Sequence, residues 1–316
     1  MAWLKILRIP NLFIAAADIL AGFLLVAGLP DEILPSWWLR LAALLLTSLS
    51  LYAAGLVLND YYDRDVDASE RPERPIPSGE ITPSAAKIAG WAALLTGVLL
   101  GWGAAYAFGS LLTGCITTVL ALLVVGYDVG LKSTPLGPFV MGGCRSLNLA
   151  LGMSFLPISE FATWHYLAIA GVGLYIAGIT LFARHEAADE EEEEVPLRQT
   201  LALPTGTVLS LLGLTLLWVI LFFVGDQATL ITAHGENILF WHILWVLFAG
   251  LLLFRNGRAI LRPAPQQIQI AVMLNLQTLI LLDATLVFLF RDIVSTTIVA
   301  ALIIPTLVLS LYFRGT

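Results

Sequence analysis

Hydrophobic residues in this chain run in stretches of about 20, long enough for an α-helix to cross a bilayer. Short polar segments containing Pro, Gly or charged residues separate them. No alternation of apolar and polar residues is sustained, which argues against a transmembrane β-barrel. The pattern predicts an all-α, polytopic membrane protein. The expected helices cover residues 10–28, 38–58, 85–107, 110–127, 139–156, 164–183, 203–224, 238–254, 267–290 and 293–312.

The number of spans is nine or ten, because only Arg291-Asp292 separates the last two helices. The final helix either crosses the membrane or lies along its surface. Composition agrees with a membrane protein, since 59 % of the residues are hydrophobic and 12 % are charged. A net charge of −7 argues against a nucleic-acid partner. We interpret residues 1–316 as a single domain.

The distribution of Lys and Arg predicts the orientation. With the N-terminus in the cytoplasm, fourteen of the 16 basic residues lie on or near the cytoplasmic side, and Arg40 and Arg291 lie on the other. Such an excess is typical of cytoplasmic segments. Two acid-rich segments, 59–84 and 184–202, then fall on the cytoplasmic side as predicted active-site loops.

A row of acids follows the second expected helix. On a helix that turns about 100° per residue, one asparagine and three aspartates share a face. These residues are Asn59, Asp60, Asp63 and Asp67, whereas Asp65 points elsewhere. Like charges in a row repel one another unless a cation compensates them. Mg²⁺ prefers oxygen ligands and is commonly shared between carboxylates and substrate phosphates, so the row predicts a magnesium site.

Two arginines, Arg71 and Arg74, follow in a proline-rich turn. Guanidinium groups bind phosphate oxygens in a bidentate manner, which would suit a diphosphate leaving group. The alternative is that they neutralise nearby aspartates at the lipid headgroups. Beside the acid row, phosphate binding is the favoured interpretation.

These two segments together resemble a known family. The pattern Asn-Asp-x-x-Asp-x-x-x-Asp at 59–67, followed by Arg-Pro-x-Arg-Pro-Ile-x-x-Gly at 71–79, is similar to the UbiA superfamily of intramembrane prenyltransferases. Length and helix count agree along nearly the entire chain. The resemblance implies magnesium-dependent transfer of a prenyl group from a prenyl diphosphate to an acceptor, often an aromatic one. It also implies two four-helix halves around a central cavity.

The segment from Tyr127 to Lys132 resembles the family's Tyr…Leu-Lys loop between the fourth and fifth helices. By resemblance, Lys132 contacts the diphosphate and Tyr127 belongs to the substrate site. As an alternative, Lys132 is an ordinary lysine of a cytoplasmic loop.

The second acidic motif departs from the family. Its usual form is two aspartates about one helical turn apart after the sixth helix, and a run of acids from Glu186 to Glu194 holds that place here. On a continued helix, Glu186 shares a face with Asp189 and Glu190, which predicts a second magnesium site from Glu186 with one of the other two. The alternative is that the run is a solvated segment.

Several polar residues lie inside the expected spans: Asn11 and Asp18, Arg145 and Asn148, and Asp283. An ionisable residue within a membrane is a hypothesis for a functional site. We expect the first four to bind substrate, with Asp18 and Arg145 as a pair. These elements are similar to the UbiA-like branch that includes EboC-type members, which weakens any inference about the acceptor.

The predicted function is Mg²⁺-dependent transfer of a prenyl group to an aromatic or other lipophilic acceptor within the bilayer. Its expected partners are a prenyl diphosphate, the lipophilic acceptor and lipid. One alternative is a transporter whose ion path uses Asp18, Arg145 and Asp283. Others are a lipid-headgroup transferase, whose Asp-Gly…Ala-Arg pattern is absent, and a family member that binds prenyl lipids without turnover.

Overall fold

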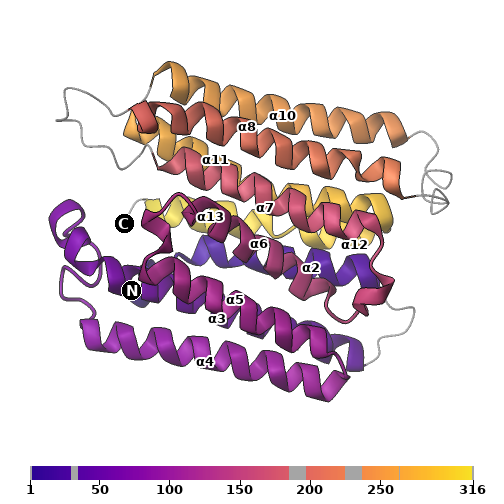
Figure 1. Cartoon of the computed structure of the whole chain (residues 1–316), viewed down its shortest axis with the longest axis horizontal. Helices are drawn as coiled ribbons and strands as arrows, with labels where there is room; N and C mark the ends of the chain where they lie inside the picture. Colours follow the sequence, from indigo (N-terminus) through magenta and orange to yellow (C-terminus); the bar gives the residue numbers. More distant parts are fainter. Residues whose placement is uncertain (1, 30–34, 185–196, 225–236, 263, 315–316) are drawn as a thin grey trace.

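A computed structural model describes residues 2–29, 35–184, 197–224, 237–262 and 264–314. Within these ranges the secondary structure is helical, with no strand. The long helices lie alongside one another as a bundle (Figure 1). The predicted all-α fold is therefore confirmed for the described part of the chain.

The helices correspond closely to the apolar stretches of the sequence. Nine segments among the described residues are long and apolar enough to cross a membrane, so the protein is an integral, multi-pass membrane protein. Helix α6, with 17 residues, is shorter than these nine segments and is not among them. The α-helices are α1 Ala2–Ile6, α2 Ile9–Ala27, α3 Pro35–Glu70, α4 Pro83–Phe108, α5 Leu111–Val129, α6 Gly137–Met153, α7 Thr163–Ala183, α8 Leu197–Val219, α10 Asn237–Leu261, α11 Pro265–Phe290, α12 Ile293–Ala300 and α13 Ile303–Arg314, and the 3₁₀ turns are η1 Leu131–Ser133, η2 Ile158–Glu160 and η3 Ile220–Phe223. The expected last helix is thus divided into α12 and α13.

The segment 59–84 differs from the predicted loop, because α3 continues to Glu70 and only residues 71–82 are irregular. Thr82 then caps α4, since its hydroxyl accepts a 3.3 Å hydrogen bond from the backbone N–H of Ala85. Of the segment 184–202, residues 197–202 belong to α8, and 185–196 lie outside the described residues. The acid row is therefore carried on a helix that projects beyond its apolar stretch.

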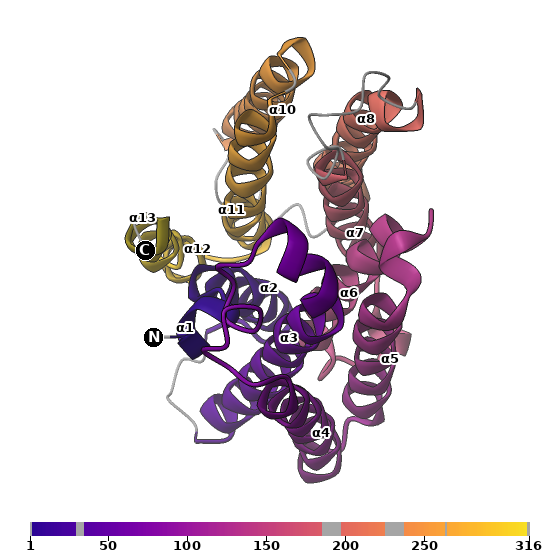
Figure 2. The ribbon, with the colours of Figure 1, turned by 90° about the vertical axis from the view of Figure 1, so that its left-hand side faces the viewer.

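Many charged residues lie at one end of the bundle. We call it the acidic end, and it comprises α1, residues 59–82 and η1. Figure 2 looks onto this end, with α2 near the centre, α3 to α5 on one side, and α7/α8 and α10/α11 as two arms on the other. The chain's N-terminus lies at this same end (Figure 1).

Helices α2 and α6 cross closely at two glycines, Gly22 and Gly152. A Cβ on Gly152 would stand 2.5 Å from the carbonyl oxygen of Ile19, and one on Gly22 would stand 3.0 Å from the Cα of Gly152. Small residues permit such close approach between membrane helices. Asp18 lies one turn before Gly22, and Asn148 lies one turn before Gly152, so the crossing brings these polar residues to the same level.

Candidate active site

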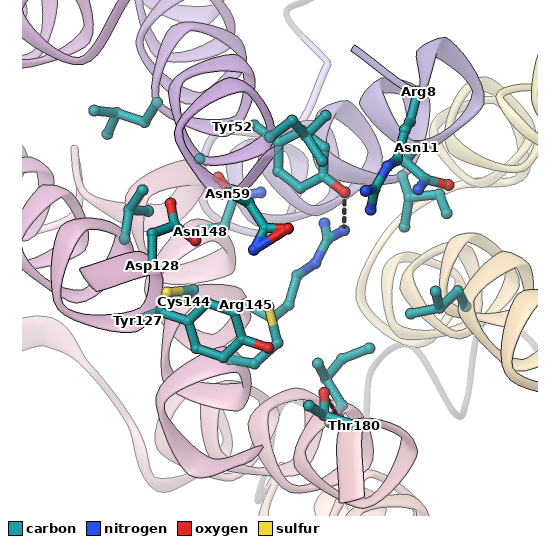
Figure 3. Close-up of a pocket in the computed structure, with 18 of the residues that line it drawn as sticks. Arg8, Asn11, Tyr52, Asn59, Tyr127, Asp128, Cys144, Arg145, Asn148 and Thr180 are labelled. Carbon is teal, nitrogen blue, oxygen red and sulfur yellow. Dashed lines mark hydrogen bonds between the residues drawn. The ribbon is translucent and has the colours of Figure 1, made fainter. Parts of the chain in front are cut away.

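A cavity of about 360 Å³ opens among α2, α3, α5, α6, α7 and α11. Its volume is in the range of small-molecule binding sites. Part of its wall is apolar, formed by Leu51, Leu120, Val124, Ile176, Ile179 and Leu276. Figure 3 shows the polar lining, with Tyr127 and Asp128 on one side, Arg8 and Asn11 on another, and Arg145 reaching between them.

The guanidinium of Arg145 projects into this cavity. Its Nη1 donates a 3.0 Å hydrogen bond to Oδ2 of Asp18. Its Nη2 donates a 3.3 Å bond to the hydroxyl of Tyr52 (Figure 3). The guanidinium carbon also lies 5.0 Å from the centre of the Tyr52 ring, a cation–π distance. The structure therefore brings the two predicted partners, Asp18 and Arg145, into a buried ion pair.

Asn148 fixes the orientation of this pair. Its amide nitrogen donates 2.9 Å hydrogen bonds to Oδ2 of Asp18 and to the carbonyl of Ala15, and its amide oxygen accepts a 2.6 Å bond from the hydroxyl of Ser48. With every polar atom of its amide engaged, Asn148 links α2, α3 and α6.

Asp283 of α11 lies close enough to Asp18 and Arg145 to interact with both electrostatically, and both aspartates are fully buried. Neither oxygen of Asp283 has a hydrogen-bond donor among the described residues. The three residues of the proposed ion path thus lie together in one buried group, instead of being spaced across the membrane.

The acid row of α3 pairs with cations from other parts of the acidic end. Oδ1 of Asp60 lies 3.1 Å from Nη2 of Arg8 and 3.6 Å from Nη1 of Arg74, and Oδ2 of Asp67 lies 2.7 Å from the same Arg74 nitrogen. Asp60 and Asp67 are 4 % and 3 % exposed. Two buried carboxylates therefore share one arginine, with a second arginine supplied by the N-terminal segment.

Asp63 completes this pairing through a hydrogen bond from the ammonium group of Lys132 in η1. Asp65 lies on the other side of α3, 84 % exposed, with its carboxylate 3.4 Å from Arg64. The helical repeat predicts this separation of Asp65 from the other three aspartates.

Arg184 holds the turn that carries Lys132. Its Nη2 donates a 2.8 Å hydrogen bond to the carbonyl of Lys132 and a second one to the carbonyl of Thr134. Gly137 leaves room for this side chain, since a Cβ there would stand 2.5 Å from the same Nη2. The first residue after α7 thus determines where the α5–α6 connection presents its lysine.

The remaining predicted site residues fall into three groups. Asn11, Asn59, Tyr127, Arg145 and Asn148 line the cavity. The three aspartates of the α3 face do not line it, and Asp18 lies behind Arg145. Among the described residues, Arg71 forms no ion pair with the acid row, and the predicted second metal site, Glu186 with Asp189 or Glu190, lies outside them.

Two residues of the site were missed by the sequence-based prediction. Arg8, which lies between α1 and α2 in the chain, lines the cavity. Its φ of 43° is a left-handed conformation that is uncommon for a residue other than glycine. In the sequence it is one more basic residue of a cytoplasmic segment. Asp128 also lines the cavity, and the only signal was its position as an acid at the end of an apolar helix.

The donor set suits magnesium in the presence of a phosphate ligand. Within the described ranges, no three His, Cys, Asp or Glu side chains converge closely enough to enclose a metal ion. Mg²⁺ needs less, because proteins usually hold it by one or two carboxylates together with substrate phosphates and water. Carboxylate and amide oxygens are available on α3, and the buried Oδ2 of Asp128 has no described hydrogen-bond donor.

The sequence pattern of the UbiA prenyltransferase family matches residues 19–279, most of the chain. The chain belongs to this family. It is 38 % identical over 136 residues to a digeranylgeranylglyceryl phosphate synthase of Methanospirillum hungatei, a match covering 43 % of this chain and 44 % of the relative. A synthase of the same name from Methanoregula boonei is 32 % identical over 207 residues, with 64 % and 67 % covered. The chain thus spans less than half of the first relative.

Solved structures share the fold of this UbiA family member. A UbiA homologue from Archaeoglobus fulgidus, bound to GPP and Mg²⁺, superimposes with a TM-score of 0.59 at 15 % identity, covering 95 % of this chain and all of that one. A structure of a digeranylgeranylglyceryl phosphate synthase gives a TM-score of 0.61 at 20 % identity, with 91 % and 96 % covered. At these identities the comparison establishes the fold alone.

Proposed function

We propose that this protein transfers a prenyl group from a prenyl diphosphate to a lipophilic acceptor within the membrane, with Mg²⁺ as cofactor. The observation that carries the proposal is the arrangement of acids and cations at one end of an apolar cavity: Asp60, Asp63 and Asp67 on α3, with Arg8, Arg74 and Lys132 against them. In the reaction, the bond between the prenyl carbon and the diphosphate oxygen breaks. The acceptor's nucleophilic atom bonds to that carbon, its proton leaves, and diphosphate is released.

The paired charges supply binding groups for both components. Bound Mg²⁺ would neutralise the charge that develops on the leaving diphosphate. Asn59 and Asp63 would hold the ion, and the cations now paired with the aspartates would donate hydrogen bonds to phosphate oxygens. Each cation would then exchange a carboxylate for a phosphate oxygen as its anionic partner.

The apolar wall of the cavity would hold the isoprenoid chain. Leu51, Ile176 and Leu276 come from three different helices and face the same space. A largely apolar environment excludes water from the reacting carbon and so disfavours hydrolysis of the prenyl group.

For the acceptor, we propose a glyceryl phosphate lipid with a free hydroxyl, and geranylgeranyl diphosphate as the donor. The support is the shared name of the relatives, which are digeranylgeranylglyceryl phosphate synthases. An ether bond would then form between the prenyl carbon and the hydroxyl oxygen. The alternative is an aromatic acceptor. We also propose that the acidic end faces the cytoplasm, because fourteen of the 16 basic residues lie on or near that side in this orientation.

The test is turnover by the purified protein in lipid nanodiscs with geranylgeranyl diphosphate, Mg²⁺ and one of two acceptors, geranylgeranylglyceryl phosphate or 4-hydroxybenzoate. Diphosphate release and product mass are measured. We expect the ether product, its loss in EDTA, and a fall in kcat/KM of about 100-fold or more for Asp63→Asn and Arg74→Ala, as for loss of a group that stabilises developing charge. Asp65→Asn is the matched control. An aromatic product would overturn the acceptor, and unchanged turnover of Asp63→Asn would overturn the site.

A further inference from the structure

Asp128 differs from the three aspartates of the α3 face in lacking a cation in contact. It is the penultimate residue of α5, it lines the cavity, and it is 4 % exposed. Oδ2 has no hydrogen-bond donor among the described residues, and no described Lys or Arg forms an ion pair with it. By contrast, Asp60, Asp63 and Asp67 each have a cationic partner.

An unpartnered buried carboxylate is costly, and such groups in native proteins are usually paired or coordinate a metal. The charges that act on Asp128 identify where a partner would come from. Lys132 and, less strongly, Arg8 attract its carboxylate, and Asp63 and Asp60 of α3 repel it. Asp128 therefore belongs electrostatically to the acid row, although it projects from a different helix. A divalent cation between the two helices would both compensate the unpaired carboxylate and remove its repulsion by the aspartates of α3.

We propose that Asp128 is a ligand of the first magnesium site, so that the ion is held between α5, through Asp128, and α3, through Asn59 and Asp63. The inference rests on the proposed function. Two carboxylates with phosphate oxygens and water form a typical Mg²⁺ site. Asn59 and Asp128 both line the cavity, as Figure 3 shows, and Asp63 hydrogen-bonds Lys132 in the turn directly after α5. In the free protein, Lys132 supplies the positive charge that the ion would bring, and on metal binding it is available to the diphosphate.

The position of this ligand has a consequence for the second acidic motif. The acid run Glu186–Glu194 departs from the family's two-aspartate form. A carboxylate from α5 gives the cavity an acid outside α3 without any contribution from that run. Metal affinity at the first site should then depend on Asp128 more strongly than on Glu186.

The test is metal binding by the full chain in nanodiscs, with inorganic diphosphate present. Mn²⁺, which accepts the same oxygen ligands, is titrated and followed by its EPR signal. Asp128→Asn keeps the shape of the side chain and is expected to raise the Kd about tenfold or more, the range seen on loss of groups that support a metal site. Asp65→Asn, on the exposed side of α3, is the control and should bind as the wild type does.

A second readout separates loss of a ligand from loss of fold. In EDTA, Asp128→Asn should unfold at the same temperature as the wild type or higher, because an unpaired buried acid is gone. Mg²⁺ with diphosphate should then stabilise it less than it stabilises the wild type. If the Asn variant does not fold, Asp128→Ser is measured in the same way.

Wild-type Mn²⁺ affinity in Asp128→Asn would overturn the inference, whether or not turnover falls, since a fall in turnover alone would indicate a role in handling the acceptor's proton. If Asp128→Asn binds Mn²⁺ as the wild type does while Asp63→Asn has lost Mn²⁺ binding, the proposed function stands without Asp128 as a ligand. If the wild type itself binds no Mn²⁺ with diphosphate, the proposed function fails as well.

Discussion

Nη1 of Arg145 lies 3.0 Å from Oδ2 of Asp18, and the two side chains are 8 % and 0 % exposed. The pair joins residues 127 apart in the sequence, on α6 and α2. Asp283 of α11 lies buried close enough to interact electrostatically with both residues. The floor of the cavity is therefore a charged contact between three helices, and its geometry depends on all three.

Asp18→Ala should be strongly destabilising. It leaves the guanidinium of Arg145 buried without its carboxylate, and breaking a buried pair in this way costs about 3–5 kcal/mol. The measurement is reversible unfolding in detergent. Asp65→Ala removes an exposed ion pair, which contributes about 0–1 kcal/mol, and serves as the control. Equal stability of the two variants would show that Arg145 does not depend on Asp18.

The close crossing of α2 and α6 predicts that Gly152→Ala destabilises the protein, whereas Gly250→Ala, in α10, does not. Gly152→Ala places a methyl group 2.5 Å from the carbonyl oxygen of Ile19, so the helices must separate. Overpacking of this kind costs about 1–3 kcal/mol. Gly250 of α10 has no atom within 4 Å of an added Cβ, so Gly250→Ala should leave the unfolding temperature unchanged or raise it slightly. A neutral Gly152→Ala would contradict the close crossing.

The turn that presents Lys132 can be tested without changing a charged residue. Gly137→Ala puts a Cβ 2.5 Å from Nη2 of Arg184 and 2.7 Å from the carbonyl of Lys132, so the lysine should shift from its position beside Asp63. We expect a KM for prenyl diphosphate raised about tenfold, in line with the sensitivity of catalysis to misplacement of about 1 Å. Gly130→Ala is the control in the same connection, since nothing lies within 4 Å of its Cβ position. A raised KM in both variants would instead indicate general loosening of the turn.

The stability of the protein should depend on pH through Asp292, which lies at the end of the bundle opposite the acidic end. Its carboxylate accepts hydrogen bonds from the backbone N–H and the hydroxyl of Ser295, at 2.9 and 2.7 Å, and this lowers the pKa of Asp292. Such an N-cap stabilises α12 by about 1 kcal/mol. Because the folded-state pKa lies below the unfolded value of about 3.9, the charged cap contributes fully above that pH. Its contribution is lost as the pH falls through the folded-state pKa.

The measurement is the unfolding temperature of the wild type and of Asp292→Ala between pH 6 and pH 3. The difference should shrink toward the acid end of that range. Asp292→Ser keeps a capping oxygen without a titrating group, so its stability relative to Asp292→Ala should stay constant. A constant difference between the wild type and Asp292→Ala would contradict a stabilising charge at this position.

Part of the architecture follows from local sequence alone. Apolar stretches of membrane-spanning length predict the helices, because the bilayer requires each backbone polar group to be satisfied within its own segment. The helical repeat alone separates Asp65 from the other acids of α3, and the structure agrees. Hydropathy placed the end of the second span near residue 58, yet α3 continues to Glu70 because arginines from outside the helix compensate its acids.

Local sequence thus accounts for the set of helices, their membrane environment and the residues that share the α3 face, since these depend on neighbours within one or two turns. Tertiary structure decided which partner each charge has. Arg8 pairs with Asp60 across 52 positions, and Arg145 pairs with Asp18 across 127. It also decided that Asp128 is buried beside the cavity without a donor. Such contacts depend on how helices cross, and crossings are set by packing between segments distant in the chain.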